Sequence, residues 1–229
     1  MNNKCIICCS NLNTKLNALR KCIKCDITVH DICYGYTNSK NPNSIFKCEM
    51  CRATTSKNIS KICAVCPIEG GALKKTTKNT WVHLVCALFI PEVFFENNQS
   101  MANINIDHIP ATRYSQQCHF CVQENKMESS KTGACIKCNK KDCYIYFHVT
   151  CAMKQNVLSE INCKGRTCRY VGFCLMHKRK RNKSTICKEA TAQSSAVNEA
   201  AREATAQSST VNEAAEEATN AITSSDKKH

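Results

Sequence analysis

The chain has few of the residues from which an ordinary hydrophobic core is built. Of its 229 residues 6% are aromatic, and it contains one Trp, six Gly and four Pro. Its most apolar window, residues 81–95, contains His83, Pro91 and Glu92, and no apolar stretch of signal-peptide length follows Met1. We therefore expect no membrane span, no secretion and no membrane partner.

Catalytic motifs are missing as well. The sequence shows no paired carboxylates, no glycine-rich loop of the kind that cradles phosphate, and no Cys–His arrangement typical of a nucleophile. We therefore predict no catalytic residues and a protein that is not an enzyme.

Cysteine, in contrast, is abundant. There are 21 cysteines, about 9% of the chain, a fraction at which cysteine becomes a main part of the scaffold. Such a density indicates either disulfides in a secreted protein or bound metal inside a cell. Because no secretion signal is apparent, we predict a zinc protein.

The cysteines stop at Cys187, and the composition changes there. Residues 1–188 have a net charge of +18, whereas residues 189–229 have −4 and consist of a 14-residue repeat whose first two copies agree at 12 of 14 positions. Small and polar residues occupy the best heptad seam, which would make a poor coiled coil. We predict a disordered or weakly helical tail.

The first group of potential ligands consists of four closely spaced pairs. Structural zinc needs four tetrahedral ligands, and a Cys-x2-Cys step delivers two at once. The eight residues, enough for two ions, are Cys5, Cys8, Cys22, Cys25, His30, Cys33, Cys48 and Cys51. Cys9 is left over, because Cys5 and Cys8 already have the standard separation.

The second group provides one site, and the third provides two. The second contains Cys63, Cys66, His83 and Cys86, whose last two residues share the face of an expected helix that Pro91 ends. The third has one candidate too many. The run Cys138-x4-Cys143-x4-His148-x2-Cys151 contains the same Cys-x4-His-x2-Cys step as Cys25 to Cys33. Cys138 and Cys143 are therefore assigned as ligands, and Cys135 is interpreted as an apolar filler. The third set is Cys118, Cys121, Cys138, Cys143, His148, Cys151, Cys174 and His177.

The remaining cysteines and histidines are not assigned as ligands. Cys163, Cys168 and Cys187 lack an evident fourth partner for a sixth ion. His108, His119 and His229 are interpreted as bystanders.

The order of the ligands and the residues around them resemble a known module. Histidine in fifth place is typical of a PHD finger, and Phe46 stands where PHD fingers carry a large aromatic residue. The segments 71–74, 81–83 and 86–93 resemble a zinc knuckle, and 133–138 and 147–152 resemble a second PHD finger. Residues 5–181 thus resemble the PHD–zinc-knuckle–PHD module. That module occurs in scaffold subunits of MYST histone acetyltransferase complexes and in leukaemia-fusion cofactors of a histone H3 methyltransferase.

The resemblance implies how the ligands are shared. In a cross-braced finger alternate pairs hold one ion, which gives four sets in the two fingers. These sets are Cys5, Cys8, His30 and Cys33; Cys22, Cys25, Cys48 and Cys51; Cys118, Cys121, His148 and Cys151; and Cys138, Cys143, Cys174 and His177. With the knuckle, five zinc ions are expected.

The implied fold is a small zinc-stabilised α+β architecture. Two cross-braced PHD fingers with short antiparallel strands are joined by a one-zinc knuckle. The predicted domains are a first finger at 1–55, the knuckle with its linker at 60–112, a second, extended finger at 113–182 and the repeat tail at 183–229.

The resemblance also implies a nuclear chromatin-binding adaptor, a subunit or recruiter of a histone-modifying complex. PHD fingers bind the histone H3 tail as an added strand along the segment before the third ligand. The peptide-binding residues predicted in this way are Asn17, Ala18, Leu19, Arg20 and Lys21. No aromatic residue precedes Tyr34, so we expect no trimethyl-lysine reading by this finger. Lys15, Arg20, Lys21 and Lys24 would repel a basic tail.

The positive charge indicates DNA phosphates as a second partner. The densest basic cluster follows the last ligand and comprises Lys178, Arg179, Lys180, Arg181 and Lys183. A nuclear-import signal explains this cluster equally well. Lys74, Lys75 and Lys78 are interpreted as exposed loop charge.

Two other functions remain open at this point. RING-type and PHD-type zinc braces look alike, so a RING-like E3 ubiquitin ligase module is the main alternative. The other is a scaffold whose repeat tail oligomerises.

Overall fold

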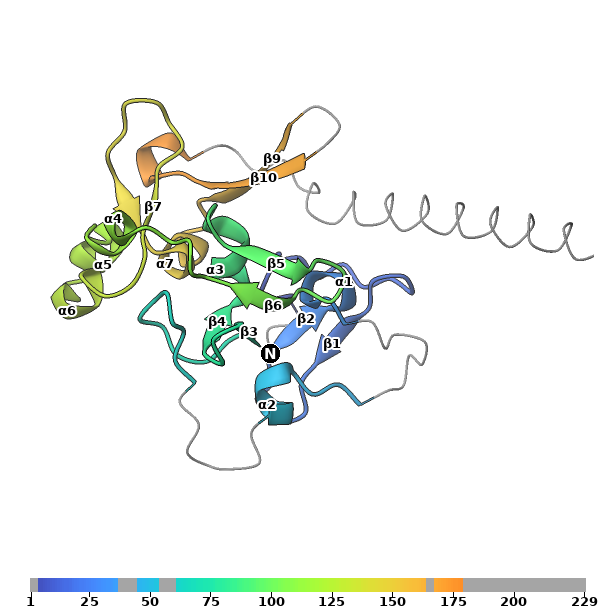
Figure 1. Ribbon diagram of the computed structural model, residues 1–229. Coiled ribbons are helices and arrows are strands. Elements are labelled where there is room, and N and C mark those ends of the chain that lie inside the picture. Colours follow the sequence, from blue (N-terminus) through green and yellow to red (C-terminus); the bar gives the residue numbers. More distant parts are fainter. Residues whose placement is uncertain (1–3, 37–44, 54–60, 164–166, 179–229) are drawn as a thin grey trace, which may run out of the picture. The chain divides into compact units, whose positions relative to one another are not determined.

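The structure, a computed structural model, describes residues 4–36, 45–53, 61–163 and 167–178, with the side chains of 160–169 excepted. The expectations for the tail at 183–229 fall outside these residues. Figure 1 shows short elements joined by loops. The strands are β1 (Leu19–Lys21), β2 (Thr28–His30), β3 (Leu73–Lys75), β4 (Trp81–His83), β5 (Phe94–Asn97), β6 (Ala102–Asn105), β7 (Ile136–Lys137), β8 (Tyr146–Phe147), β9 (Leu158–Cys163) and β10 (Thr167–Gly172). The helices are α1 (Asp31–Tyr34), α2 (Glu49–Ala53), α3 (Leu84–Phe89), α4 (Ala111–Tyr114), α5 (His119–Gln123), α6 (Met127–Ser130), α7 (Val149–Lys154) and the 3₁₀ turn η1 (Leu175–His177).

One small unit occurs three times along the chain. A strand leads to a histidine, and a helix begins at the next residue: β2 leads to α1, β4 to α3 and β8 to α7. His30, His83 and His148 occupy the N-cap positions with extended backbone, at ψ values of 150°, 134° and 144°. A cysteine follows each histidine by three residues. Since positions i and i+3 are neighbours on a helix, the unit brings histidine and cysteine together.

The strands form separate antiparallel pairs. In the described part of the chain each two-stranded sheet joins neighbours in sequence, β1 with β2, β3 with β4, β5 with β6, β7 with β8, and β9 with β10. Residues with positive φ lie in the connections of the first two pairs, at Asp26 (60°) and Asn79 (61°). Asn and Asp tolerate this backbone region better than other side chains do. An isolated two-stranded sheet is only marginally stable in water, so the stability of these pairs must come from contacts outside each sheet.

Each part of the fold has its own small core. In the first finger the rings of Tyr34 and Phe46 meet edge to face, with centroids 5.7 Å apart. In the second finger the rings of Phe120 and Phe147 lie 5.2 Å apart. The knuckle is centred on fully buried aliphatic side chains, namely Leu73, Val82, Leu84, Ile90 and Ile104.

A buried polar network joins the first finger to the knuckle. The hydroxyl of Tyr34 accepts a hydrogen bond from the Glu49 N–H at 2.9 Å and donates to the Leu73 carbonyl at 3.2 Å. The Lys74 ammonium lies 4.6 Å from the centre of the Tyr34 ring, 3.5 Å from a Glu49 carboxylate oxygen and 2.7 Å from the Ser100 carbonyl. Lys74 is only 4% exposed, so its interpretation as exposed loop charge was wrong. Its charge is compensated inside the junction.

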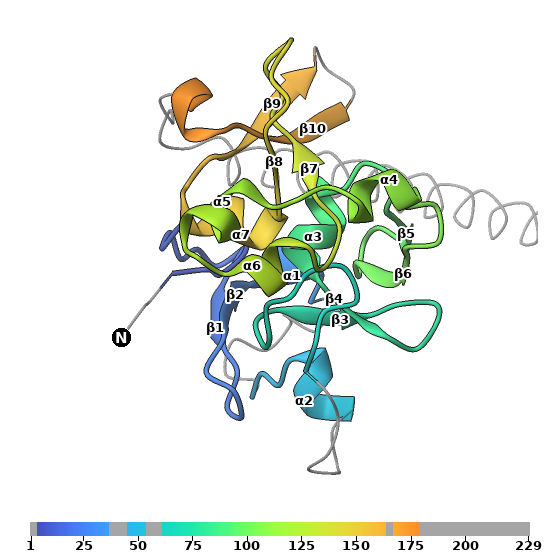
Figure 2. The ribbon, with the colours of Figure 1, turned by 90° about the vertical axis from the view of Figure 1, so that its left-hand side faces the viewer.

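The knuckle contacts the second finger through backbone and side chains. The Ala134 N–H donates to the Val65 carbonyl at 2.9 Å. The guanidinium of Arg113 binds both oxygens of Glu92, at 2.6 and 2.8 Å. In Figure 2, helix α3 of the knuckle lies beside α7, and α3 also contacts β10. The knuckle therefore contacts both fingers.

The predicted fold class is confirmed. The protein has a small zinc-binding fold of short antiparallel strand pairs and a few short helices around Cys/His clusters. Among the described residues, none of the helices has the length and apolar character needed to cross a bilayer.

Candidate metal centres

The twenty predicted ligands lie in five compact groups. The donor atoms within each group are all within 4.8 Å of one another. The groups are Cys5, Cys8, His30 and Cys33; Cys22, Cys25, Cys48 and Cys51; Cys63, Cys66, His83 and Cys86; Cys118, Cys121, His148 and Cys151; and Cys138, Cys143, Cys174 and His177. This grouping coincides with the one expected from sequence, including the alternate-pair sharing within each finger.

The spacing of the donor atoms fits tetrahedral zinc. With Zn–S bonds of about 2.3 Å, the sulfurs of a tetrahedral site lie about 3.8 Å apart. The Sγ–Sγ distance is 3.6 Å for Cys25–Cys48 and 4.0 Å for Cys143–Cys174. Three thiols with one imidazole, or four thiols, are the donor sets that structural zinc takes. The residues present therefore fit zinc.

The histidines present Nδ1 to the clusters. The Nδ1 atom of His30 lies 3.2 Å from the Cys8 sulfur, and that of His83 lies 3.2 Å from the Cys66 sulfur. Their Nε2 atoms lie 2.6 Å from the carbonyl oxygens of Leu12 and Gly70. Because a carbonyl only accepts, Nε2 must carry the proton, which leaves Nδ1 free to bind a metal ion.

One backbone hydrogen bond recurs in every group. The N–H of the third ligand in sequence order donates to the sulfur of the first ligand at 3.3–3.4 Å. The pairs are His30 with Cys5, Cys48 with Cys22, His83 with Cys63, His148 with Cys118, and Cys174 with Cys138. An N–H donor favours the thiolate, the form of cysteine that binds metal. The five sites are thus built to one local plan.

In the knuckle site the neighbouring ligands affect the pKa of the first thiol. Hydrogen bonds from the thiols of Cys66 and Cys86, together with the His83 N–H, lower the pKa of Cys63 to about 3, against the opposing effect of burial. Cys63 is thus prepared to act as a thiolate ligand.

Cys135 lies beside a cluster without belonging to it. It is fully buried, its thiol lies 3.6 Å from the Gln116 carbonyl, and a hydrogen bond from Cys135 to Cys118 is the largest cause that lowers the pKa of the Cys118 thiol. Cys135 is therefore a buried neighbour of a ligand and stands outside the group of four.

The other unassigned residues divide into two sets. Cys9 is exposed, and His108 and His119 lie outside the five groups. Cys163, Cys168 and Cys187 lie outside the described side chains, as does His229.

The residues of the predicted peptide-binding segment have different environments and partners. The amide oxygen of Asn17 accepts from the Ile32 N–H at 3.0 Å, and the Ala18 carbonyl accepts from Asp31. The guanidinium of Arg20 is buried and lies 3.1 Å from the Asp31 carboxylate. The expectation that Arg20 repels a basic tail was wrong, because Asp31 neutralises its charge.

The predicted nucleic-acid cluster is described at one residue only. Lys178 is exposed, and its Nζ donates to the Gln155 carbonyl at 3.4 Å. Arg179, Lys180, Arg181 and Lys183 fall outside the described residues.

Sequence reasoning missed the groups that support the ligands. The carbonyls of Leu12 and Gly70 orient two histidines, and no sequence signal marks a carbonyl for this role. Asn13, whose side chain binds the backbone of β1, was missed as well. Its position in a polar run before a strand was the only available hint.

Five closed Cys/His groups, three of which take a histidine and a cysteine from a strand–histidine–helix unit, define a zinc-finger protein of the PHD class. Comparison with known families agrees. Residues 61–189 match the family described as PHD-zinc-finger like domain, and residues 17–52 match the PHD-finger family. The chain belongs to the PHD-zinc-finger-like family, and its described part is a PHD–zinc-knuckle–PHD module.

Individual proteins resemble the chain over the same region. Zinc finger protein zfp-1 of Caenorhabditis elegans is 35% identical over 77% of this chain, and Protein Jade-1 of Danio rerio is 37% identical over 76%. The crystal structure of the zebrafish PHF14 PZP module has a TM-score of 0.64 and 28% identity, covering 77% of this chain and 89% of that one. The chain spans 21% of the length of zfp-1 and 20% of that of Jade-1.

Proposed function

We propose that the chain is a nuclear, non-enzymatic chromatin-binding adaptor that serves or recruits a histone-modifying complex. The observation that carries this proposal is the set of five closed ligand groups in PHD–knuckle–PHD order. Proteins similar to the chain over 76% of its length include Protein AF-17 of Homo sapiens, at 33% identity, and Bromodomain and PHD finger-containing protein 3 of Mus musculus, at 35%.

Zinc has a structural role in this proposal, with five ions held by the five groups. A catalytic zinc site keeps one coordination position open for water or substrate, whereas each group here offers four protein ligands. The ions would fix the loops that carry the binding surfaces.

The first proposed partner is the histone H3 tail, bound along the open edge of β1. Backbone pairing is the main interaction that this edge offers, because the three carboxylates of the first finger lie in ion pairs, of which only that of Asp26 is exposed at the surface. Asp26 pairs with Lys21, Asp31 with Arg20, and Glu49 with Lys74. The finger's three described aromatic residues are Tyr34, Tyr36 and Phe46, and the Phe46 ring packs against both tyrosines. The proposal includes no trimethyl-lysine reading by this finger.

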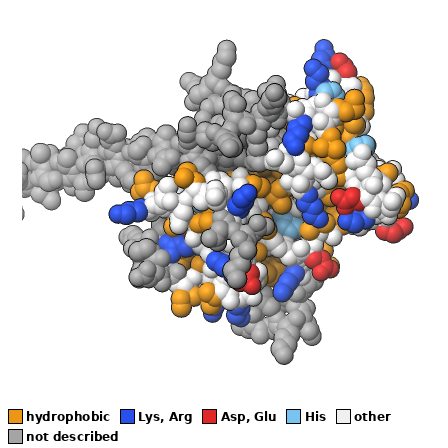
Figure 3. Space-filling view, turned by 180° about the vertical axis from the view of Figure 1, so that it is seen from behind, with side chains coloured by type: hydrophobic (Ala, Val, Ile, Leu, Met, Phe, Trp, Pro, Cys, Tyr) orange, Lys and Arg blue, Asp and Glu red, His pale blue; other side chains and the backbone are white. Residues whose placement is uncertain are grey.

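The second proposed partner is the phosphate backbone of nucleosomal DNA. Lys and Arg side chains are spread over the face seen in Figure 3 and are not gathered in one patch. Such a distribution suits contacts that carry no base sequence information.

Salt dependence provides the test of this proposal. With three to five phosphate contacts, the affinity for a DNA duplex should fall about 40- to 500-fold between 50 and 200 mM salt. Replacing Lys178, Arg179, Lys180 and Arg181 by alanine should flatten that dependence, whereas Lys126→Ala, which removes an exposed lysine paired with Glu124, should not. Binding to H3 peptides is measured in the same series. No detectable affinity for either ligand at low salt would contradict the proposal.

A further inference from the structure

The open edge of β1 offers few backbone groups to an added strand. The backbone groups of Ala18 and Cys22 bond towards the β2 side, at 3.0 and 2.9 Å. Because bonding direction alternates along an antiparallel strand, the N–H and C=O of Leu19 and Lys21 point to the opposite, open side. A strand that pairs with this edge would use those four groups.

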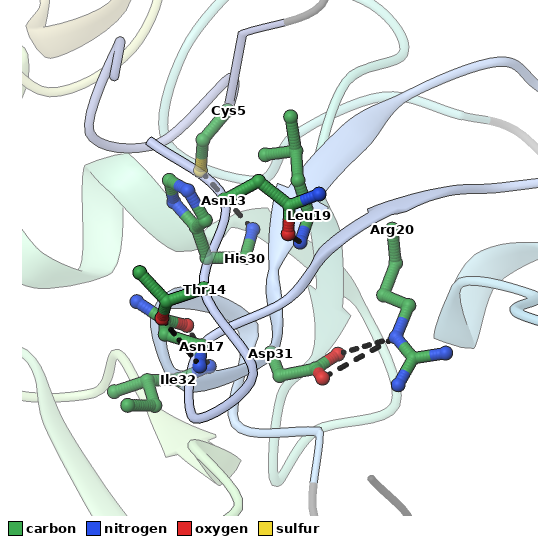
Figure 4. Close-up of polar contacts among 9 residues, drawn as sticks. All are labelled: Cys5, Asn13, Thr14, Asn17, Leu19, Arg20, His30, Asp31 and Ile32. Carbon is green, nitrogen blue, oxygen red and sulfur yellow. Dashed lines mark hydrogen bonds and ion pairs between the residues drawn. The ribbon is translucent and has the colours of Figure 1, made fainter. Parts of the chain in front are cut away.

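The side chain of Asn13 already occupies one of these groups. Its amide oxygen accepts a hydrogen bond from the Leu19 N–H at 3.0 Å, as Figure 4 shows. Within the described residues, the structure records no hydrogen bond for the Leu19 carbonyl or for the N–H and carbonyl of Lys21. The carboxamide of Asn13 thus takes the place of the first peptide carbonyl of an added strand.

Hydrogen bonds hold the loop that carries Asn13 both before and after that residue. Before it, the Leu12 carbonyl is bound by Nε2 of His30 at 2.6 Å. After it, Thr14 Oγ1 accepts from the Asn17 N–H at 3.1 Å, and the Asn17 amide oxygen accepts from Ile32 (Figure 4). Little conformational entropy is therefore lost when the Asn13 side chain makes its bond.

We propose that Asn13 is a specificity-determining residue that shortens the β1 docking edge by acting as an internal substitute for a peptide strand. This inference rests on the proposed strand addition of an extended peptide to β1. The wild-type edge then pairs with a bound peptide only from the Leu19 carbonyl to Lys21. A peptide that extends past Leu19 must displace the Asn13 carboxamide, which favours short or terminal segments over internal ones.

The variant Asn13→Ala should free the Leu19 N–H and so add one hydrogen-bond donor to the open edge of β1. A peptide that spans the whole strand would gain one hydrogen bond, which corresponds to about 3- to 10-fold tighter binding. Asn11→Ala is the matched control, because Asn11 is an exposed asparagine of the same loop with no recorded contact to β1.

The experiment uses the full zinc-loaded chain and an unmodified H3 peptide of residues 1–20, with a scrambled peptide of equal charge for comparison. Titration calorimetry or fluorescence anisotropy gives the affinities of the wild type, Asn13→Ala and Asn11→Ala. Hydrogen exchange of the Leu19 amide is followed with and without peptide. Without peptide, this amide should exchange faster in Asn13→Ala than in the other two chains, and added peptide should restore its protection.

The outcomes separate this inference from the proposed function. Tighter binding by Asn13→Ala alone, with Leu19 protected by the H3 peptide, supports it. Equal affinities for the three chains would overturn the role of Asn13 and leave the proposed H3 binding standing. An absence of H3 binding by all three would overturn both. Equal Leu19 exchange in the three peptide-free chains would overturn the role of Asn13 whatever the affinities.

Discussion

Removing zinc from the purified chain is expected to unfold both fingers and the knuckle. Each structural zinc contributes about 10–16 kcal/mol of apparent binding free energy coupled to folding, which is comparable to or larger than the 5–15 kcal/mol total stability of a typical domain. The described strands form two-stranded pairs, and the cores contain few aromatic side chains. Excess chelator at neutral pH should therefore abolish the dispersed amide NMR signals and most of the far-ultraviolet circular dichroism.

The control for this experiment is the same chelator saturated with zinc beforehand. It should leave the spectrum unchanged, and adding zinc back under reducing conditions should restore it. A chain that keeps its dispersed spectrum after losing all bound metal would show that the apolar cores suffice.

Replacement of Gly133 by valine is expected to be strongly destabilising, although Gly133 is not a ligand. Gly133 has φ of +93°, and a Cβ added there would lie 2.8 Å from the Val65 carbonyl oxygen and 2.8 Å from Cα of Cys66. The Val65 carbonyl also accepts the Ala134 N–H, so the clash would disturb that bond as well. Backbone strain and overpacking together should lower stability by about 2–5 kcal/mol, measured by chemical denaturation of the zinc-loaded chain.

Gly70→Val is the matched control for this prediction. Gly70 has φ of +73°, so the variant shares the backbone strain, but a Cβ there meets nothing within 4 Å. The loss should then be limited to the strain, about 1–2 kcal/mol. Equal losses for the two glycines would show that close contact between the knuckle and the second finger contributes nothing.

The ligand grouping could be predicted because its information is local. A Cys-x2-Cys or His-x2-Cys step fixes two donors by backbone geometry, and only the pairing of the steps depends on the fold. That pairing came from the resemblance to a known module. The assignment of Cys138 over Cys135 came from a repeated spacing, and the structure places Cys138 in a group of four and Cys135 beside another.

The environment of the charged residues could not be predicted, because it depends on contacts between distant segments. Lys74 looks like any loop lysine in sequence, yet Tyr34, Glu49 and Ser100 surround it. Arg20 likewise looks like surface charge, and Asp31, eleven residues away, neutralises it. Such pairs carry no spacing signature of their own.

Each of the five groups of four residues is expected to hold one zinc ion. Native mass spectrometry of three chains tests it most directly. We expect five zinc ions for the wild type, five for Cys135→Ser and four for Cys138→Ser, because only Cys138 belongs to a group. Four or six ions in the wild type, or a lost ion in Cys135→Ser with none lost in Cys138→Ser, would contradict this assignment of the zinc ligands.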